Sequence, residues 1–375
     1  MSPSHRIGFP AMHEENGEKR AFLPKFIHWL SRQGAEIYLE KGYGAKLGFT
    51  FADYQFEGRK IVETSREEAF QQDIVMILRS PKIEELSLLR RGGTLISMLH
   101  YATRPQRVAR LQELGIRAIS LDSITTGSGI RLVENMKSVA WNGLETAFDL
   151  LEDRFPGLRK DNGDPFRVVV MGTGMVGKHA IDAATKFGSR ARTALLAGAS
   201  HSGVIPIGVG RNITADIIQM EKLFHETDVL VDTTMRDDAS KPLVPNAWLA
   251  WLPTHAVIVD LAVDPYLLDG DPPVVRGIEG IPQGNLDQYI FHPDDPNWTA
   301  KIPDVIPSDV RRTSVSCYSW PGIHPKACMR HYEIQLKPLM EVLLEVGYEG
   351  LANARYHFGR ALYRGTLDYF LKQNG

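Results

Sequence analysis

The segment Arg167-Val-Val-Val-Met-Gly-Thr-Gly-Met-Val-Gly-Lys178 organises the chain. Its run of valines shows no alternation of apolar and polar residues, which is typical of a strand buried on both faces. A Gly-x-Gly-x-x-Gly pattern follows at once, and a helix is predicted next, over residues 179–187. Strand, glycine turn and helix in this order are the pattern of a dinucleotide-binding fold.

Each glycine of this pattern has its own physical reason. The first permits a tight turn, the second lets the backbone approach a pyrophosphate, and the third lets the helix pack closely on the strand. The helix N-terminus then offers free N–H groups and the positive end of its dipole to the phosphates. The residues expected to bind a nicotinamide or flavin dinucleotide are Gly172, Thr173, Gly174, Met175, Val176 and Gly177.

Length and composition point to two globular domains. The chain has 375 residues, enough for two cores, and its 43 basic residues nearly balance its 45 acidic ones, so nucleic acid or a membrane surface is not an expected partner. Two cysteines argue against a disulfide scaffold or a cysteine metal site, and no metal is expected. Without a signal-like N-terminus or a long apolar run, we expect a soluble cytoplasmic protein.

The part of the chain before the glycine segment predicts an α/β domain. Two continuous apolar strands, 73–78 and 93–99, end at Arg79 and His100, and a polar loop carries Arg20 to the start of a helix. Because the carboxyl ends of parallel strands meet at one edge of a sheet, Arg79 and His100 are placed to contact one small molecule. A further strand over 118–121 ends at Asp122.

An amphipathic helix over 135–155, closed by Pro156-Gly157, indicates the domain boundary. The helices predicted at 332–346 and 351–371 are expected to return to the first domain. The prediction is therefore an α/β protein with two Rossmann-like, doubly wound domains. A catalytic domain would comprise residues 1–134 with 310–375, and a dinucleotide-binding domain residues 135–309.

The choice of cofactor depends on the second strand of the nucleotide domain, which we predict over 192–196. In such folds an acid at the end of this strand binds the ribose 2′-OH of NAD, but the sequence there is Ala197-Gly-Ala-Ser-His-Ser202. Ser200, His201 and Arg211 are available donors, so NADP is favoured over NAD. Two later strands, 228–232 and 256–260, lead to Thr233 and Asp264 at the same edge, where we expect contacts with the cofactor.

Six motifs in order carry a family resemblance. They are Glu18-Lys-Arg-Ala-Phe-Leu-Pro24, Glu40-Lys-Gly-Tyr-Gly44 with Gly48-Phe-Thr50, Leu95-Ile-Ser-Met-Leu-His100, the glycine segment, Val259-Asp-Leu-Ala-Val-Asp264, and Trp320-Pro-Gly-Ile-His-Pro-Lys326. With these motifs, most of the chain resembles the alanine dehydrogenase and pyridine nucleotide transhydrogenase α-subunit family. That family also includes reductases that form saccharopine and carboxyethylornithine.

The resemblance implies roles for the residues at the matching positions. Arg20 and Arg79 would hold a substrate carboxylate, His100 would act as general acid and base, and Asp264 would orient a water or amine. Ser319 and Trp320 would also bind substrate. Lysine is usual in the family where Arg79 stands, asparagine where Ser319 stands, and an acid where Ala197 stands. Arg79 keeps the positive charge but cannot lose a proton.

The function expected from the resemblance is hydride transfer between a nicotinamide and the α-carbon of an amino or imino acid. The departures from the family favour reductive condensation of a 2-oxo acid with an amino acid, as in opine and saccharopine synthesis. Oxidative deamination of a simple amino acid, as in alanine dehydrogenase, is the alternative, and a nucleotide-binding protein without activity is a lesser one. The family also leads us to expect a homo-oligomer.

Overall fold

A computed structural model describes residues 5–12 and 15–374. The first residues of the N-terminus, considered above for a signal sequence, and His13 and Glu14 of the loop before Arg20 lie outside the described residues. The chain forms two compact units, Met1–Asn135 with His324–Gly375, and Met136–Ile323. The chain returns from the second unit to the first after residue 323, and not after residue 309 as the predicted boundary had it. The reason is that the strand at 313–316 pairs within the second unit.

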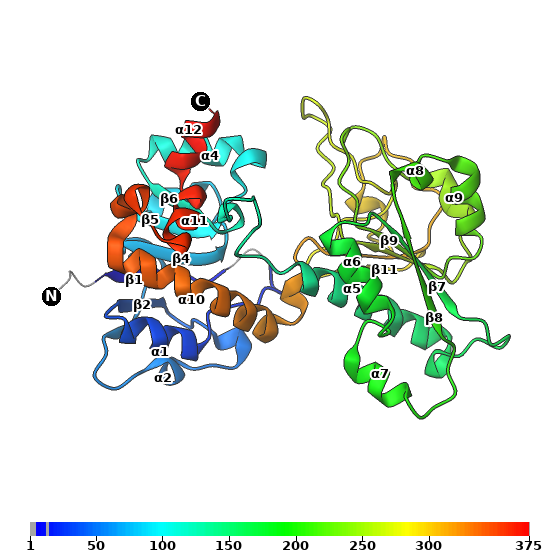
Figure 1. Cartoon of the computed structure of the whole chain (residues 1–375), viewed down its shortest axis with the longest axis horizontal. Coiled ribbons are helices and arrows are strands. Elements are labelled where there is room, and N and C mark those ends of the chain that lie inside the picture. Colours follow the sequence, from blue (N-terminus) through cyan, green and yellow to red (C-terminus); the bar gives the residue numbers. More distant parts are fainter. Residues whose placement is uncertain (1–4, 13–14, 375) are drawn as a thin grey trace. The chain divides into compact units, whose positions relative to one another are not determined.

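The first unit contains a six-stranded sheet in the order β3-β2-β1-β4-β5-β6 (Figure 1). The strands are β1 (Arg6–Phe9), β2 (Glu36–Glu40), β3 (Ile61–Thr64), β4 (Ile74–Arg79), β5 (Thr94–Met98) and β6 (Arg117–Ser120). All neighbouring strands are parallel. The strand order reverses between β1 and β4, and ligands of doubly wound sheets bind beyond the carboxyl ends at such a point.

Helices surround this sheet, and those at the C-terminus return to it as predicted. The helices are α1 (Pro24–Arg32), α2 (Phe51–Tyr54), α3 (Arg66–Phe70), α4 (Pro105–Glu113), α10 (Pro325–Gly350), α11 (His357–Gly365) and α12 (Leu367–Asn374). Three of them begin with a proline, which is tolerated there because the first N–H groups of a helix need no intrahelical partner. The red helices α11 and α12 lie beside β6 (Figure 1).

The second unit has a six-stranded sheet in the order β11-β12-β10-β9-β7-β8. Its strands are β7 (Phe166–Met171), β8 (Val204–Val209), β9 (Val229–Asp232), β10 (Val257–Asp260), β11 (Ile290–Phe291) and β12 (Thr313–Ser316), and its helices are α5 (Met136–Arg154), α6 (Met175–Ala184), α7 (Arg190–Leu196), α8 (Arg211–Thr214) and α9 (Ile217–Phe224). Only β11, at one edge, is antiparallel among these described strands. The strand order reverses between β7 and β9, beside the glycine segment.

The predicted strand at 192–196 is wrong, because these residues form helix α7. The true second strand is β8, which pairs with β7 from Phe166↔Val204 to Met171↔Val209. Its sequence, Val-Ile-Pro-Ile-Gly-Val, contains a proline and a glycine, which weaken a strand signal but are compatible with the sheet edge that β8 occupies.

This correction also moves two predicted cofactor contacts. Ser200 and His201 precede β8, and the register places them near the start of β7, at the edge opposite Gly172. The ring of His201 packs edge-on against Phe187, and its Nδ1 lies 2.8 Å from the carbonyl oxygen of Ser202. Neither residue therefore reaches the glycine turn, and the strand end that matters for cofactor choice is residue 209 and not 196.

The first unit contains a buried carboxyl group, and its raised pKa makes the stability of the protein depend on pH. Glu333 on α10 is 6% exposed, and its Oε1 accepts a hydrogen bond of 2.6 Å from the N–H of Leu23. Burial raises the pKa of Glu333 to about 8. The folded state therefore keeps a proton that the unfolded chain loses near its ordinary pKa, so the free energy of unfolding falls as the pH rises from about 4.5 to 8.

We predict that Glu333→Gln abolishes this fall in the free energy of unfolding, which for the unmodified protein is on the order of 3 kcal/mol at pH 7. The glutamine keeps an oxygen to accept the Leu23 N–H and carries no charge at any pH. Urea unfolding of both proteins at pH 5 and pH 8 measures the effect. The prediction fails if the two proteins lose the same stability between these pH values.

Candidate functional site

The glycine turn of the second unit has the geometry of a dinucleotide cradle. Gly172, directly after β7, has a φ of 95°, a left-handed conformation that favours glycine. A Cβ on Gly177 would lie 2.1 Å from the carbonyl oxygen of Gly172, so only glycine lets α6 approach the strand. Nothing lies within 4 Å of a Cβ on Gly174, which leaves its backbone open to a ligand. These three environments fit the three roles that a pyrophosphate site requires.

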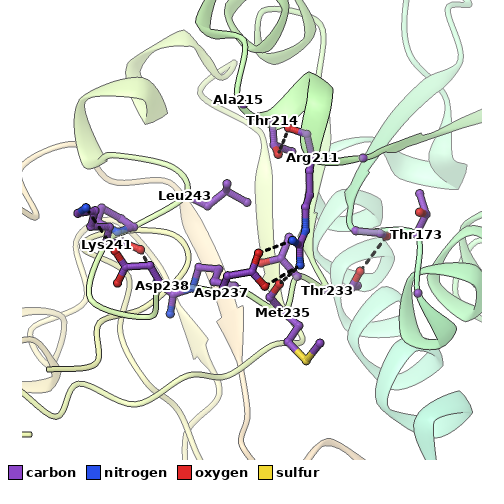
Figure 2. A pocket seen from close by; sticks show the side chains of 16 residues that line it. Thr173, Arg211, Thr214, Ala215, Thr233, Met235, Asp237, Asp238, Lys241 and Leu243 are labelled. Atoms are coloured by element: carbon purple, nitrogen blue, oxygen red, sulfur yellow. Dashed lines mark hydrogen bonds and ion pairs between the residues drawn. The ribbon is translucent and has the colours of Figure 1, made fainter. Parts of the chain in front are cut away.

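A cavity of about 530 Å³ lies at this turn (Figure 2). Its lining comes from the segments that follow β7, β8 and β9, which end at the same edge of the sheet. The volume is within the range of pockets that hold cofactors. Of the predicted cofactor contacts, Gly172, Thr173, Gly174 and Thr233 line the cavity. The hydroxyl of Thr233 donates to the carbonyl oxygens of Met171 and Gly172, at 2.8 and 3.0 Å, and braces the turn.

Charged side chains line the cavity beyond the glycines. Arg211, two residues after β8, forms an ion pair with Asp237, and Lys241 lies 3.3 Å from Asp238 (Figure 2). Arg236 also lines the cavity, and its Nη2 lies 2.7 Å from Oδ2 of Asp264. The predicted catalytic Asp264 is thus held by an arginine that the sequence analysis did not identify.

The loop that carries Asp264 is strained. Val263 has a φ of 54°, which is a rare conformation for a β-branched residue. Residues in such strained conformations are found most often at functional sites. Its N–H donates to Oδ1 of Asp260 at 2.9 Å, which helps hold the loop in place. This hydrogen bond and the ion pair with Arg236 together hold the Asp264 carboxylate in position.

Ser319 and Trp320 belong to the same unit but are buried. The Trp320 indole N–H donates to the carbonyl oxygen of Asp260 at 2.9 Å, and the Trp320 carbonyl oxygen accepts from the Asn142 amide at 2.8 Å. The Trp320 side chain belongs to the hydrophobic core of the unit. The Trp320 side chain therefore supports the end of β10, and its contact with substrate stays a prediction.

In the first unit, Arg20 is occupied by an internal carboxylate. Its Nε and Nη2 donate to the two oxygens of Glu18 at 2.9 and 2.5 Å, and both side chains are almost completely buried. Burial opposes ionisation of Glu18, but the bonds from Arg20 outweigh it and lower the pKa of Glu18 to about 2. Arg20 therefore holds the Glu18 carboxylate in place, and its contact with a substrate carboxylate stays a prediction.

Arg79, the last residue of β4, is the more accessible of the two predicted arginines. Its Nη1 donates to Oε1 of Glu15 at 2.6 Å and to Oε2 of Glu18 at 3.2 Å. Its side chain is 15% exposed and lines a small cavity of about 50 Å³ next to Met12 and Ser80. The carboxylates of Glu15 and Glu18 thus balance the charges of Arg20 and Arg79, and the sequence analysis did not identify this pairing.

His100 follows β5 and is paired with Asp122, which follows β6. His100 has a φ of 51°, and its Nδ1 lies 3.4 Å from Oδ2 of Asp122. The other Asp122 oxygen accepts from the N–H groups of Leu99 and His100 and from the Ser120 hydroxyl. Burial opposes ionisation of Asp122, but the hydrogen bonds from His100 and Ser120 hold its pKa below the ordinary value. An ionised Asp122 directs the Nδ1 proton and leaves Nε2 for another partner.

Residues 5–12 and 15–374 contain neither a membrane-spanning helix nor a cluster of metal-binding side chains. No helix in these ranges combines the length and apolar character needed to span a bilayer. The same residues contain no group of three or more histidine, cysteine or carboxylate side chains arranged to hold a metal ion.

Comparisons with known proteins agree with the two-unit arrangement. Residues 11–140 match the family model "Alanine dehydrogenase/PNT, N-terminal domain", and residues 160–266 match "Alanine dehydrogenase/PNT, C-terminal domain". Similar proteins include the alanine dehydrogenase of Methanococcus maripaludis, 24% identical over 269 residues, or 69% of this chain and 72% of that protein. The alanine dehydrogenase of Mycobacterium tuberculosis strain H37Rv is 25% identical over 274 residues, with the same shares covered.

Solved structures share the fold. An L-alanine dehydrogenase superposes with a TM-score of 0.70 at 21% identity, over 96% of this chain and 94% of that one. A transhydrogenase from Sinorhizobium meliloti gives a TM-score of 0.60 at 16% identity, over 91% and 94%. These values support the predicted α/β fold with two Rossmann-like domains.

Two glycines of the turn allow nucleotide binding and protein stability to be tested separately. We expect Gly174→Ala to keep the stability of the protein, because its Cβ enters open space, and to weaken binding of NADH and NADPH by at least about tenfold, because the methyl group blocks the pyrophosphate. Gly177→Ala is the matched control and should lower the melting temperature, because its Cβ meets backbone. Unchanged nucleotide affinity in a folded Gly174→Ala protein would contradict the assignment.

Proposed function

Because the chain belongs to the alanine dehydrogenase/PNT family, we propose that it is a nicotinamide-dependent oxidoreductase that interconverts an amino acid with its 2-oxo acid and ammonia. The matched proteins are alanine dehydrogenases, which favours this reaction over the condensation of two larger substrates. The substrate class is a small amino acid, and the reaction acts on its CH–NH bond.

One observation carries the proposal for the first unit. Arg79 and His100 stand at the carboxyl ends of neighbouring strands, and Arg79 pairs in register with Met98, two residues before His100. A guanidinium suited to a carboxylate and an imidazole suited to proton transfer therefore lie at one edge of one sheet. An amino acid presents a carboxylate and an amine on the same carbon, which is the pair of groups that these two side chains recognise.

The proposed catalytic work of this chain is proton transfer and orientation. When bound, the dinucleotide supplies the hydride acceptor or donor. Nε2 of His100 takes a proton from the nitrogen or oxygen on the α-carbon and returns it in the reverse direction, a role typically worth about 10²–10⁴-fold in rate. Asp122 holds the imidazole through Nδ1 and stabilises its charged form. Arg79 holds the carboxylate and, as an arginine, takes no part in proton transfer.

The role of Asp264 in orienting water or amine is proposed from the family resemblance. Support comes from its fixed position, since Arg236 holds one of its carboxylate oxygens while its side chain keeps 34% exposure. A group that is anchored but accessible can still accept a hydrogen bond from a ligand.

Reductive condensation with a second amino acid is the second candidate. The feature that favours it is Arg79 in place of the family lysine, because an added carboxylate is well matched by a bidentate guanidinium. For the cofactor we propose NADP(H) ahead of NAD(H). Support comes from the end of β8, where Gly210 and Arg211 stand instead of an acid. A cytoplasmic location and assembly into a homo-oligomer are proposed on the resemblance alone.

We predict that His100→Ala lowers turnover by about 10²-fold or more, because the proton-transfer group is lost. Nucleotide affinity should remain unchanged, because the cradle lies in the other unit. Steady-state rates and fluorescence titration of the reduced nicotinamide measure the two effects. His225→Ala, which removes an exposed histidine from the second unit, serves as the control. Full turnover in the His100 variant would remove this residue from the mechanism.

An amine panel tests the proposed reaction class. With pyruvate and a reduced nicotinamide, we expect ammonia to support oxidation of the cofactor, whereas lysine or ornithine at the same concentration should support little. The absorbance of the reduced nicotinamide measures the rate. Faster oxidation with an amino acid as amine would favour condensation, and binding of the nucleotide without turnover on a broad panel of 2-oxo acids would favour a protein without activity.

A further inference from the structure

The cavity of the second unit has a cationic side chain at the position that distinguishes the two nicotinamide cofactors. We propose that Arg211 binds the 2′-phosphate of NADP(H), and that Asp237 occupies this arginine as an internal competitor that tunes the choice of cofactor. The inference rests on the proposed dinucleotide function and names the residues that give it specificity.

The position of Arg211 follows from the topology. In a dinucleotide fold, the end of the second strand faces the ribose of the adenosine half, and here that strand is β8. Arg211 comes two residues after β8 and lines the same cavity as Gly172, Thr173 and Gly174. The intervening Gly210 has no side chain that could accept from a ribose hydroxyl. The place usually taken by an acid therefore carries a guanidinium nearby.

The guanidinium is arranged as a fork. Its Nη1 and Nη2 donate to the two carboxylate oxygens of Asp237, so Arg211 already adopts the bidentate geometry used to bind a phosphate. In Figure 2, Arg211 and Asp237 point toward one another along the cavity. Asp237 thus mimics the anionic group that we assign to this arginine.

Relative charge and exposure decide which anion is preferred. The side chains of Arg211 and Asp237 are 71% and 79% exposed, and ion pairs between such exposed groups contribute little to stability. A phosphate monoester carries a charge of about −1.5 to −2 near neutral pH and offers three acceptor oxygens, against the single charge of a carboxylate. A 2′-phosphate can therefore displace Asp237, whereas the ribose hydroxyl of NAD(H) cannot.

Lys241 provides an internal comparison. It lines the same cavity, is similarly exposed and is paired with Asp238, but Figure 2 shows it separated from Arg211 by the two aspartates. It does not follow β8. Loss of its charge changes the general electrostatics of the cavity without removing the fork that we assign to the phosphate.

The test measures dissociation constants for NADPH and NADH at fixed ionic strength, by nicotinamide fluorescence, in the full-length protein and three variants. We expect the unmodified protein to bind NADPH more tightly than NADH. Arg211→Gln should weaken NADPH by about 10–100-fold and leave NADH within about threefold. Asp237→Asn should tighten NADPH by several-fold. Lys241→Gln should change both nucleotides by the same factor. All three positions are on the surface, and melting curves confirm the fold.

Two results would overturn the inference while leaving the proposed function intact. The first is an NADPH to NADH ratio that Arg211→Gln does not change. The second is weaker NADH binding in Asp237→Asn, which would make Asp237 the acid that binds the ribose hydroxyls of NAD(H). Failure of the unmodified protein to bind either nucleotide would instead contradict the dinucleotide function itself. Competition by 2′-AMP but not by 5′-AMP would further support a 2′-phosphate subsite.

Discussion

Parallel strands all end at the same edge of their sheet, and both units of this protein depend on that constraint. In the first unit it brings Arg79, His100 and Asp122 to the ends of β4, β5 and β6. In the second it brings the glycine turn and the segments after β8 and β9 around one cavity. Residues far apart in the sequence become neighbours because parallel pairing brings the carboxyl ends of these strands side by side.

Internal carboxylates pair with the arginines that could bind anionic ligands in both units. Glu15 and Glu18 hold Arg79, Asp264 holds Arg236, and Asp237 holds Arg211. A buried guanidinium without a partner would be costly, so the carboxylates beside Arg79 and Arg236, whose side chains are 15% and 7% exposed, let the folded protein keep these two cations in place. An anionic ligand at Arg79 or Arg211 therefore competes with a carboxylate of the protein, and affinity depends on the difference between the two interactions.

Local sequence signals predicted most of the elements well. Unbroken apolar runs identified β4, β5, β7, β9 and β10, and prolines and glycines marked the limits of α1 and of the long helix α5. The failure at β8 has a physical cause. An edge strand needs few apolar residues and tolerates proline, whereas residues 192–196, which we predicted as a strand, lie on a short helix capped by the Ser189 side chain. Tertiary pairing with β7, and not local propensity, makes residues 204–209 a strand.

The sequence by itself determined the two α/β domains, the glycine turn and the identity of Arg79 and His100 as residues at strand ends, because these follow from periodicity and from the backbone freedom of glycine. Only the tertiary structure decided which charges meet. The pairing of Arg79 with Glu18, His100 with Asp122, and Arg211 with Asp237 joins side chains whose distances depend on loop paths and strand register. Coulomb attraction falls with distance and no local pattern encodes that distance, so the electrostatics of a site emerge only when the chain has folded.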